Sequence, residues 1–284
     1  MDPFVFTLVL TAAVLHAGWN ALIKISGDPW VRLALTNLLG TVFGLAFLPF
    51  VGFPNAEAWP FILSSVAIHQ FYFVFVCLQY RYGDLSHVYP ISRGVAPLMV
   101  AFGAYVFAGE SLSFQGIAAV VLISAAILSL TFSTAWKPGE GKSVLFALCT
   151  GVTIAFYSVV DGLGGRSAND IAGYIAYLFL IDGLPFGLVV FFLRRRAFMP
   201  VLRANWKIGL LSGLLSYPAY ALVIWAMTKS PLTYVSALRE TSVLLAVLIG
   251  TRLMGEPFGT RRLIAVALVV LGVAALQFNK APVL

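Results

Sequence analysis

Residues 171–193 read IAGYIAYLFLIDGLPFGLVVFFL, an apolar stretch in which Asp182 is the one charged residue. A helix of this length rises about 34 Å at roughly 1.5 Å per residue, enough to cross the hydrocarbon core of a bilayer. The stretch lacks the alternation of apolar and polar residues that marks a strand of a membrane β-barrel. It therefore predicts a transmembrane helix, and similar stretches recur along the chain.

The composition of the whole chain agrees with that prediction. Of the 284 residues, 61% are hydrophobic and 10% are charged, whereas soluble domains are about 45–50% apolar and about 25% charged. A soluble fold would have no place for so much apolar surface. A soluble enzyme, a nucleic-acid-binding module and a disordered protein are therefore excluded, and an all-α polytopic membrane protein remains.

Apolar runs and the turn residues between them predict ten transmembrane helices. Ten spans of about 20 residues leave too little chain for a separate soluble domain. Cys77 and Cys149 fall inside apolar runs, which argues against a disulfide framework. The predicted spans are residues 3–24, 32–52, 59–80, 86–108, 113–133, 142–162, 171–193, 205–228, 232–253 and 259–279.

Lys and Arg are distributed unequally between the predicted loops. Loops that follow odd-numbered spans hold 13 of the 18 basic residues, loops and tail on the other side hold three, and Arg93 and Arg239 lie inside spans. Because cytoplasmic loops are enriched in Lys and Arg, we expect both termini outside and the chain in the cytoplasmic (inner) membrane. The first segment does not resemble a cleavable signal peptide, since Met1-Asp2-Pro3 carries no positive charge.

Two regions of the chain resemble each other. Placing Trp59 on Trp206 gives an offset of 147 residues that holds without a gap up to Leu85 and Leu232. One residue then drops out, after which further pairs match: Arg93 with Arg239, Gly109 with Gly255, and Glu110 with Glu256. Three polar positions spaced by four also match between the first and sixth spans: His16, Asn20 and Lys24 with Thr153, Tyr157 and Asp161.

The chain is therefore expected to contain two repeats of five helices, residues 1–134 and 142–280. Because five is odd, the two halves cross the membrane in opposite directions. Such inverted repeats are typical of alternating-access transporters, in which the substrate site lies near the midplane between the halves.

Several of these residues resemble a known family. The segment HAGWNALIK at residues 16–24 and the paired Gly-Glu sequences at 109–110 and 255–256 are similar to EamA-domain proteins of the drug/metabolite transporter superfamily. The resemblance implies a ten-helix secondary transporter in which the fifth and tenth helices pack together and the other eight surround a central cavity. Members carry amino acids, nucleotide sugars, sugar phosphates, amines and other metabolites, and many are exporters. Smaller relatives carry a Glu in the first helix, but this chain has His16 and Asn20 there instead.

Asp182 and His69 lie near the centres of their spans and are candidates for proton coupling. An acid in the bilayer centre costs about 2.5–3.5 kcal/mol on insertion scales, so a functional reason is expected. A protonated Asp182 bonded to carbonyls freed at Gly183 and Pro185 is the alternative. His69 shares one helix face with Tyr72, and simple packing is the alternative for that face.

Arg93 and Arg239 each lie about seven residues inside their spans, roughly 10 Å deep, and the topology places them toward opposite faces of the membrane. The guanidinium fork of Arg suits a carboxylate, phosphate or phosphonate, whereas snorkelling or structural pairing is the alternative. Three acids are gating or charge-neutralising candidates. Glu110 is a partner for Arg239, Glu256 is a partner for Arg93, and Glu240 directly follows Arg239.

Further candidates for lining the substrate site are aromatic or amide residues. Tyr217 and Tyr220 flank Pro218, and interrupted helices mark binding sites in transporters. The rings of Trp19 and Tyr157 suit an ammonium group, although packing explains them equally well. Asn20 lies beside Trp19 on the first span.

These residues favour a secondary transporter of a small polar metabolite, with export as the expected direction. Two arginines favour an anionic group, while the aromatic residues and Asp182 favour an amine. A zwitterion such as an amino acid or aminophosphonate satisfies both.

The alternative is an integral-membrane enzyme acting on a lipid or lipid-linked substrate, but the three histidines form no metal-binding or catalytic motif. We expect no cofactor, metal or nucleic acid. The expected partners are the lipid bilayer and a small-molecule substrate, with the protein a monomer or homodimer.

Overall fold

The computed structural model describes residues 1–23, 28–83, 85–131, 141–245 and 259–278, and every regular element within these ranges is a helix. The elements are α1 (Pro3–Ile23), α2 (Pro29–Phe47), the short 3₁₀ helix η1 (Leu48–Phe50), α3 (Trp59–Tyr82), α4 (Leu85–Ala108), α5 (Phe114–Ser129), α6 (Gly141–Ser167), α7 (Ile171–Leu193), α8 (Arg195–Met227), α9 (Leu232–Arg239) and α11 (Thr260–Phe278).

The prediction of an all-α polytopic membrane protein is confirmed. Eight helices among the described residues are long and apolar enough to cross a membrane, and α5 is a shorter apolar helix. Each predicted span contains a helix, and most agree with its bounds to within a few residues. The ninth span begins with α9, but its last residues, 246–253, lie outside the described ranges. Runs of apolar residues predicted these helices correctly, because a helix in lipid must satisfy its backbone hydrogen bonds internally and carry mostly apolar side chains.

The predicted start of the eighth span, at residue 205, is ten residues too late. The helix α8 begins at Arg195, directly after Arg194 has ended α7. Its first turns hold exposed Arg195 and Arg196 together with buried Phe198, which packs near Phe191. An amphipathic segment of this kind is stable as a helix at the membrane surface, where hydropathy alone predicts a loop.

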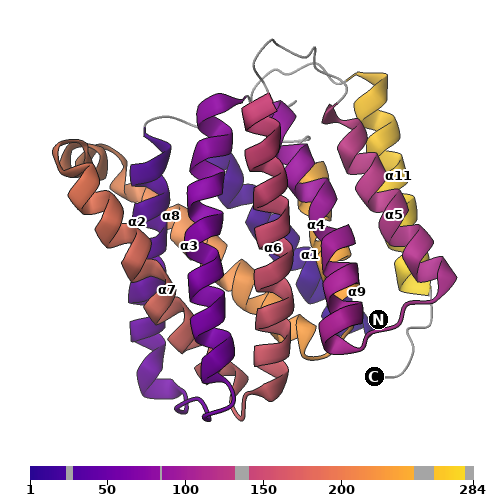
Figure 1. Ribbon diagram of the computed structural model, residues 1–284, viewed down its shortest axis with the longest axis horizontal. Coiled ribbons are helices and arrows are strands. Elements are labelled where there is room, and N and C mark those ends of the chain that lie inside the picture. Colours follow the sequence, from indigo (N-terminus) through magenta and orange to yellow (C-terminus); the bar gives the residue numbers. More distant parts are fainter. Residues whose placement is uncertain (24–27, 84, 132–140, 246–258, 279–284) are drawn as a thin grey trace.

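The helices pack in pairs that map onto each other when the two halves of the chain are exchanged. The helix α3 packs against α6 as α8 packs against α1, while the pairs α2–α7 and α5–α11 each map onto themselves. Two inverted repeats of five helices produce this contact pattern. Figure 1 shows α5 and α11 side by side at one edge of the bundle, which confirms the expected pairing of the fifth and tenth spans.

Glycine residues bring α2 and α7 unusually close together. A Cβ on Gly183 would overlap the Asn37 carbonyl oxygen, and a Cβ on Gly44 would overlap the α7 backbone at Leu180. Small residues allow close contact of membrane helices, whose association gains little from the hydrophobic effect. The contact fixes the position of Asp182, which precedes Gly183 on α7.

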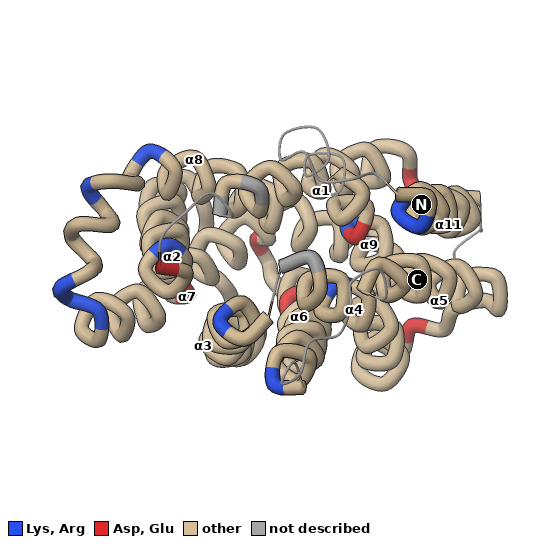
Figure 2. The backbone as a smooth tube through the Cα atoms, turned by 90° about the horizontal axis from the view of Figure 1, so that it is seen from above, with Lys and Arg blue, Asp and Glu red and all other residues tan. Residues whose placement is uncertain are grey.

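The outside of the bundle is apolar and its charges concentrate at helix ends. Large exposed side chains such as Phe102, Phe107, Phe114 and Phe192 project from the helices, as expected for residues that face lipid. Figure 2 shows basic segments mainly at the rim of the bundle and a few acidic segments among the helices. The Gln277 side chain donates a hydrogen bond to the Met1 carbonyl at 3.3 Å. The beginning of α1 and the end of α11 therefore lie at the same end of the bundle.

Candidate substrate site

A buried cluster of charges lies where α4 meets α9. Arg93 on α4, Arg239 at the end of α9 and the following Glu240 are 3%, 2% and 0% exposed. Arg93 Nε lies 2.7 Å from Glu240 Oε2, and Arg239 Nε lies 3.8 Å from Glu240 Oε1. The two helices thus bring both guanidinium groups to one carboxylate, although each arginine lies on a different repeat.

The position of Glu240 results from an interruption in the ninth span. The helix α9 ends at Arg239, Glu240 forms a turn, and residues 241–245 are helical again. The Glu240 amide donates to the Ala237 carbonyl at 3.2 Å, and the Val243 amide donates to the Glu240 carbonyl at 2.9 Å. These bonds span three residues instead of four, so the chain is locally tighter than an α-helix. Adjacent residues on a regular helix do not face each other, but here Arg239 and Glu240 do.

Among the residues that the structure describes, the cluster holds two guanidinium groups and one carboxylate. Arg93 is held by Glu240, by the Ser242 hydroxyl at 3.5 Å from its Nη2, and by the Tyr89 ring, whose centroid lies 6.0 Å from its Cζ. The Nε and Nη2 atoms of Arg239 are buried and have no hydrogen-bond partner among the described residues, and the same holds for Arg93 Nε and both carboxylate oxygens of Glu240. Neither guanidinium group therefore has a full set of acceptors within the described part of the chain.

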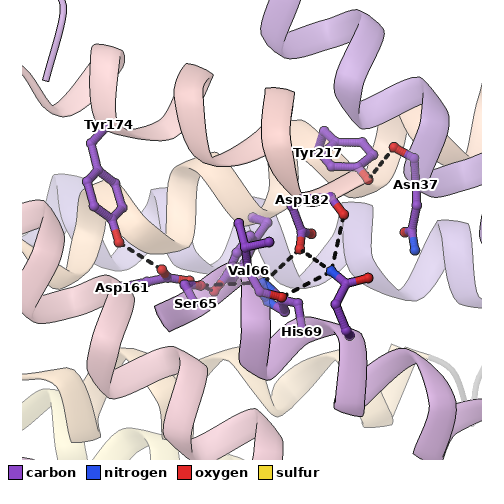
Figure 3. Close-up of polar contacts among 10 residues, drawn as sticks. Asn37, Ser65, Val66, His69, Asp161, Tyr174, Asp182 and Tyr217 are labelled. Atoms are coloured by element: carbon purple, nitrogen blue, oxygen red, sulfur yellow. Dashed lines mark hydrogen bonds and ion pairs between the residues drawn. The ribbon is translucent and has the colours of Figure 1, made fainter. Parts of the chain in front are cut away.

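A second buried polar cluster joins α3 to α7 (Figure 3). His69 Nδ1 lies 3.5 Å from Asp182 Oδ1, and both side chains are 7% exposed. The Gln70 amide donates to Asp182 Oδ1 at 3.3 Å and to the Val66 carbonyl at 3.0 Å. The predicted candidates His69 and Asp182, which are 113 residues apart in sequence, are thus brought into contact across the two halves of the chain.

Aromatic rings surround His69. Its ring centroid lies 4.3 Å from that of Tyr157, 5.8 Å from that of Tyr220 and 6.2 Å from that of Tyr72. All three tyrosines were predicted to line the site. Tyr217 lies farther along, where its hydroxyl donates to the Asn37 carbonyl at 3.3 Å (Figure 3).

The structure adds Asp161, which the sequence analysis placed in a polar stripe but did not select as a site residue. Asp161 on α6 is 0% exposed, accepts a hydrogen bond from the Tyr174 hydroxyl at 2.9 Å and accepts another from the Tyr220 hydroxyl. Its sequence signal was the spacing Thr153, Tyr157, Asp161 on one helix face.

Tyr157 connects the two clusters. It lies close enough to interact electrostatically with Arg93, Arg239 and Glu240 on one side and with Asp161 on the other. The two clusters therefore lie within electrostatic reach of one tyrosine, with Arg93, Arg239 and Glu240 in one and Asp182 with nearby Asp161 in the other. Among the described residues, no group of three His, Cys, Asp or Glu side chains has an arrangement suited to a metal ion.

The polar residues of α1 bond mainly to one another. The Trp19 indole donates to His16 Nδ1 at 3.1 Å, and the Asn20 amide donates to the His16 carbonyl at 2.8 Å. His16 interacts electrostatically with Arg93 and Arg239. Trp19 and Asn20 thus lie next to the residue that approaches the arginine cluster, while their own hydrogen bonds are local.

Glu110 pairs with Arg166 at the end of α6 and not with Arg239. Arg166 Nη2 lies 2.7 Å from Glu110 Oε1, an atom that also accepts from the Leu232 amide at 2.9 Å. Arg166 further donates to the carbonyls of Met227 and Ser230, at 3.0 Å and 3.1 Å. Glu110 therefore joins α4, α6 and the start of α9 at one end of the bundle. The other gating candidate, Glu256, lies outside the described residues.

A bundle of membrane-length helices with two contacting halves and buried charges between them defines a polytopic membrane protein of the transporter type. Residues 141–277 match the model of the EamA-like transporter family. This part of the chain is therefore an EamA-like domain, a domain of the drug/metabolite transporter superfamily. The match covers α6 to α11, which is the second predicted repeat.

Comparison with solved structures supports the same fold over the whole chain. One crystal structure covers 97% of this chain and 96% of its own, with a TM-score of 0.74 and 19% sequence identity. This likeness shows the fold alone. Among curated proteins, no sequence matches the chain.

Proposed function

We propose that the protein is a secondary transporter that moves a small metabolite with an acidic group across the cytoplasmic membrane by alternating access. The observation that carries this proposal is the buried cluster at the interruption of the ninth span. There two guanidinium groups share one carboxylate, and nitrogen atoms of both arginines lack a hydrogen-bond partner among the residues that the structure describes.

The charge balance of this cluster argues for an anionic ligand. An unpaired charge buried in a low-dielectric interior costs several kcal/mol, roughly the effective desolvation penalty of one ion. A carboxylate, phosphate or phosphonate that bound Arg239 would supply the second negative charge and the missing acceptors. Arg is suited to this role because its planar fork forms two parallel hydrogen bonds to such a group.

The opposite end of the polar region argues for an amine on the same molecule. Asp161 and Asp182 are carboxylates, and the rings of Tyr157, Tyr220 and Tyr72 lie around His69. An ammonium group is attracted both by carboxylates and by the faces of aromatic rings. A zwitterion such as an amino acid or aminophosphonate would have complementary charges at both ends, with export as the direction we propose.

The two repeats, residues 1–134 and 142–280, are the proposed moving units. Contacts between them at one end support a closed gate. Glu110 pairs with Arg166, and Asn55 and Asn169 each accept a hydrogen bond from the other's backbone amide, both at 3.1 Å. Lys and Arg bias assigns this end to the outside, together with both termini. Separation of the halves here would open the polar region to that side.

Counterflow into proteoliposomes tests the proposal. Vesicles containing the purified protein are loaded with unlabelled amino acids and 2-aminoethylphosphonate, and uptake of each compound in radiolabelled form is measured. We expect uptake of at least one zwitterion and its loss in Arg239→Gln. The matched control Arg196→Gln removes an exposed arginine of α8 and is expected to transport normally.

Two results would refute the assignment. Equal counterflow of choline, which lacks an acidic group, by the wild type and Arg239→Gln would exclude an anion site at this arginine. Turnover of lipid by the purified protein, with no counterflow of any compound, would favour a membrane enzyme.

A further inference from the structure

A buried carboxylate with neutral partners lies between the two halves. Asp161 accepts hydrogen bonds from the hydroxyls of Tyr174 and Tyr220, and the Ser65 hydroxyl lies within hydrogen-bonding reach (Figure 3). Among the described residues, its hydrogen-bond partners include no Lys or Arg. Burial disfavours an ionised carboxylate that has no cation, whereas the hydroxyl donors stabilise it.

Polar contacts continue from this carboxylate to the His69–Asp182 pair. Ser65 Oγ lies 3.4 Å from His69 Nδ1, and the same nitrogen lies 3.5 Å from Asp182 Oδ1. Ser65 and His69 belong to α3 in the first half, whereas Asp161 and Asp182 belong to α6 and α7 in the second. The chain of polar groups therefore crosses the interface at which the halves must separate during transport.

We propose that Asp161 is a proton-binding site that couples transport to proton movement, with His69 as its neighbour across the interface between the halves. This inference rests on the proposed function, because coupling requires transport.

The groups around Asp161 come from every helix packed against this part of α6. They are His69 on α3, Tyr174 and Asp182 on α7, Tyr220 on α8 and Tyr157 on α6 itself, with Arg93 on α4 and Arg239 on α9 beyond Tyr157. The ionisable groups nearest to Asp161 are therefore His69 and the tyrosines. The arginines act from a greater distance and are partly neutralised by Glu240.

The coupling step is an exchange of one positive charge for another. As the ammonium group of the substrate enters the aromatic enclosure around His69, the proton on Asp161 leaves to the water on the side from which the substrate entered. The carboxylate that results pairs with the ammonium. On the opposite side the ammonium departs and a proton returns, so one proton moves against each substrate molecule.

Infrared spectroscopy tests the proton site without any substrate. The full-length protein is reconstituted into lipid nanodiscs, and pH-difference spectra are recorded in the region of the protonated carboxyl C=O stretch. We expect a band that titrates in the wild type, is absent in Asp161→Asn and shifts in Tyr220→Phe, which removes one hydrogen-bond donor. The matched control Tyr217→Phe, whose hydroxyl bonds to Asn37 instead, should keep the wild-type band. Persistence of an unchanged band in Asp161→Asn would overturn the proposal.

Transport with 2-aminoethylphosphonate and amino acids as probes tests the coupling. Asp161→Asn should lose accumulation driven by a pH gradient, and Tyr220→Phe, which keeps the carboxylate, should shift the pH dependence of accumulation. Equal gradient-driven accumulation by Asp161→Asn and the wild type, or accumulation that follows a sodium gradient instead, would overturn the proposal. Absence of counterflow in the wild type would refute the transport function, whereas the infrared titration tests the proton site separately.

Discussion

At the scale of single residues, the most informative feature is the unequal number of charges at the interruption of the ninth span. Arg93, Arg239 and Glu240 are almost completely buried, so each charge added or removed there alters both stability and ligand attraction. The two consequences have opposite signs at Arg239. Its positive charge destabilises the empty site and attracts the proposed anionic substrate.

This charge balance predicts different effects for two neutralising variants. Glu240→Gln leaves two buried guanidinium groups without a carboxylate, and we expect the free energy of unfolding to fall by about 3–5 kcal/mol, the usual cost of breaking a buried ion pair. Arg239→Gln leaves one Arg–Glu pair and should unfold at or above the wild-type temperature, although it no longer transports. Thermal unfolding in lipid nanodiscs measures both. Identical melting temperatures for the two variants would contradict the charge-balance argument.

At the scale of helices, backbone contacts position the site. The approach of α7 to α2 at Gly183 sets the position of Asp182 opposite His69. The helix α4 ends in a turn, in which Gly109 has a φ of 64° and the Glu110 amide donates to the Ala104 carbonyl at 3.0 Å. This turn directs Glu110 toward Arg166 and explains the Gly-Glu order of the motif.

Enlarging Gly183 should disturb the α2–α7 contact. In Gly183→Ala the new Cβ would overlap the Asn37 carbonyl oxygen, so α7 must move, and we expect a loss of roughly 1–3 kcal/mol in the free energy of unfolding. Transport should fall as well, because Asp182 moves with its helix. In the matched control Gly209→Ala, the Cβ would lie 3.8 Å from Leu35 Cβ, which is an ordinary contact. Equal stability of the two variants would show that the close approach has no energetic role.

Adding a side chain at Gly109 tests the end of α4. Nothing lies within 4 Å of the position that a Cβ would occupy, so a cost in Gly109→Ala would arise from the positive φ alone, at about 1–2 kcal/mol. Gly141→Ala is the control, since its Cβ also meets nothing within 4 Å and Gly141 lacks a positive φ. Chemical denaturation of both variants provides the comparison, and a cost shared by both would exclude the conformational explanation.

At the scale of the whole molecule, contacts between the halves hold one end of the bundle closed. Arg166 at the end of α6 bonds to Glu110 and to the carbonyls of Met227 and Ser230. The connection from α2 to α3 is tied to the start of α7 by the Gly52 amide, which donates to Asp170 Oδ2 at 2.7 Å. All of these connections lie at the lower end of the bundle in Figure 1.

Removing Arg166 should open this end. In a chain whose Cys77 and Cys149 are replaced by Ser, a membrane-impermeant maleimide is applied from outside to Ser230→Cys, whose native side chain is buried at 3% exposure. Hydrogen bonds to a charged group are worth about 1.5–3 kcal/mol each, so we expect Arg166→Gln to raise the labelling rate by about tenfold or more. Lys229→Cys, at an exposed position, should label equally in both backgrounds. Failure of Lys229→Cys to label from outside would instead overturn the assigned orientation.

The sequence by itself determined the membrane class, the positions of most helices and the five-plus-five organisation. Each transmembrane helix satisfies its own backbone hydrogen bonds and needs about 20 apolar residues in succession, so these features are local and visible along the chain. Because ionisable residues are rare within the spans, the sequence also singled out four of them as candidates for a functional role: His69, Arg93, Asp182 and Arg239.

Only the tertiary structure decided which of these residues meet. Arg239 faces Glu240 because the ninth span is interrupted between two helical segments, and Glu110 bonds to Arg166 because α4 and α6 end side by side. Asp161 is a candidate site residue because it accepts hydrogen bonds from Tyr174 and Tyr220, which belong to two other helices. Contacts of this kind depend on how helices distant in sequence pack and rotate against each other. A pattern read along one helix contains no such information.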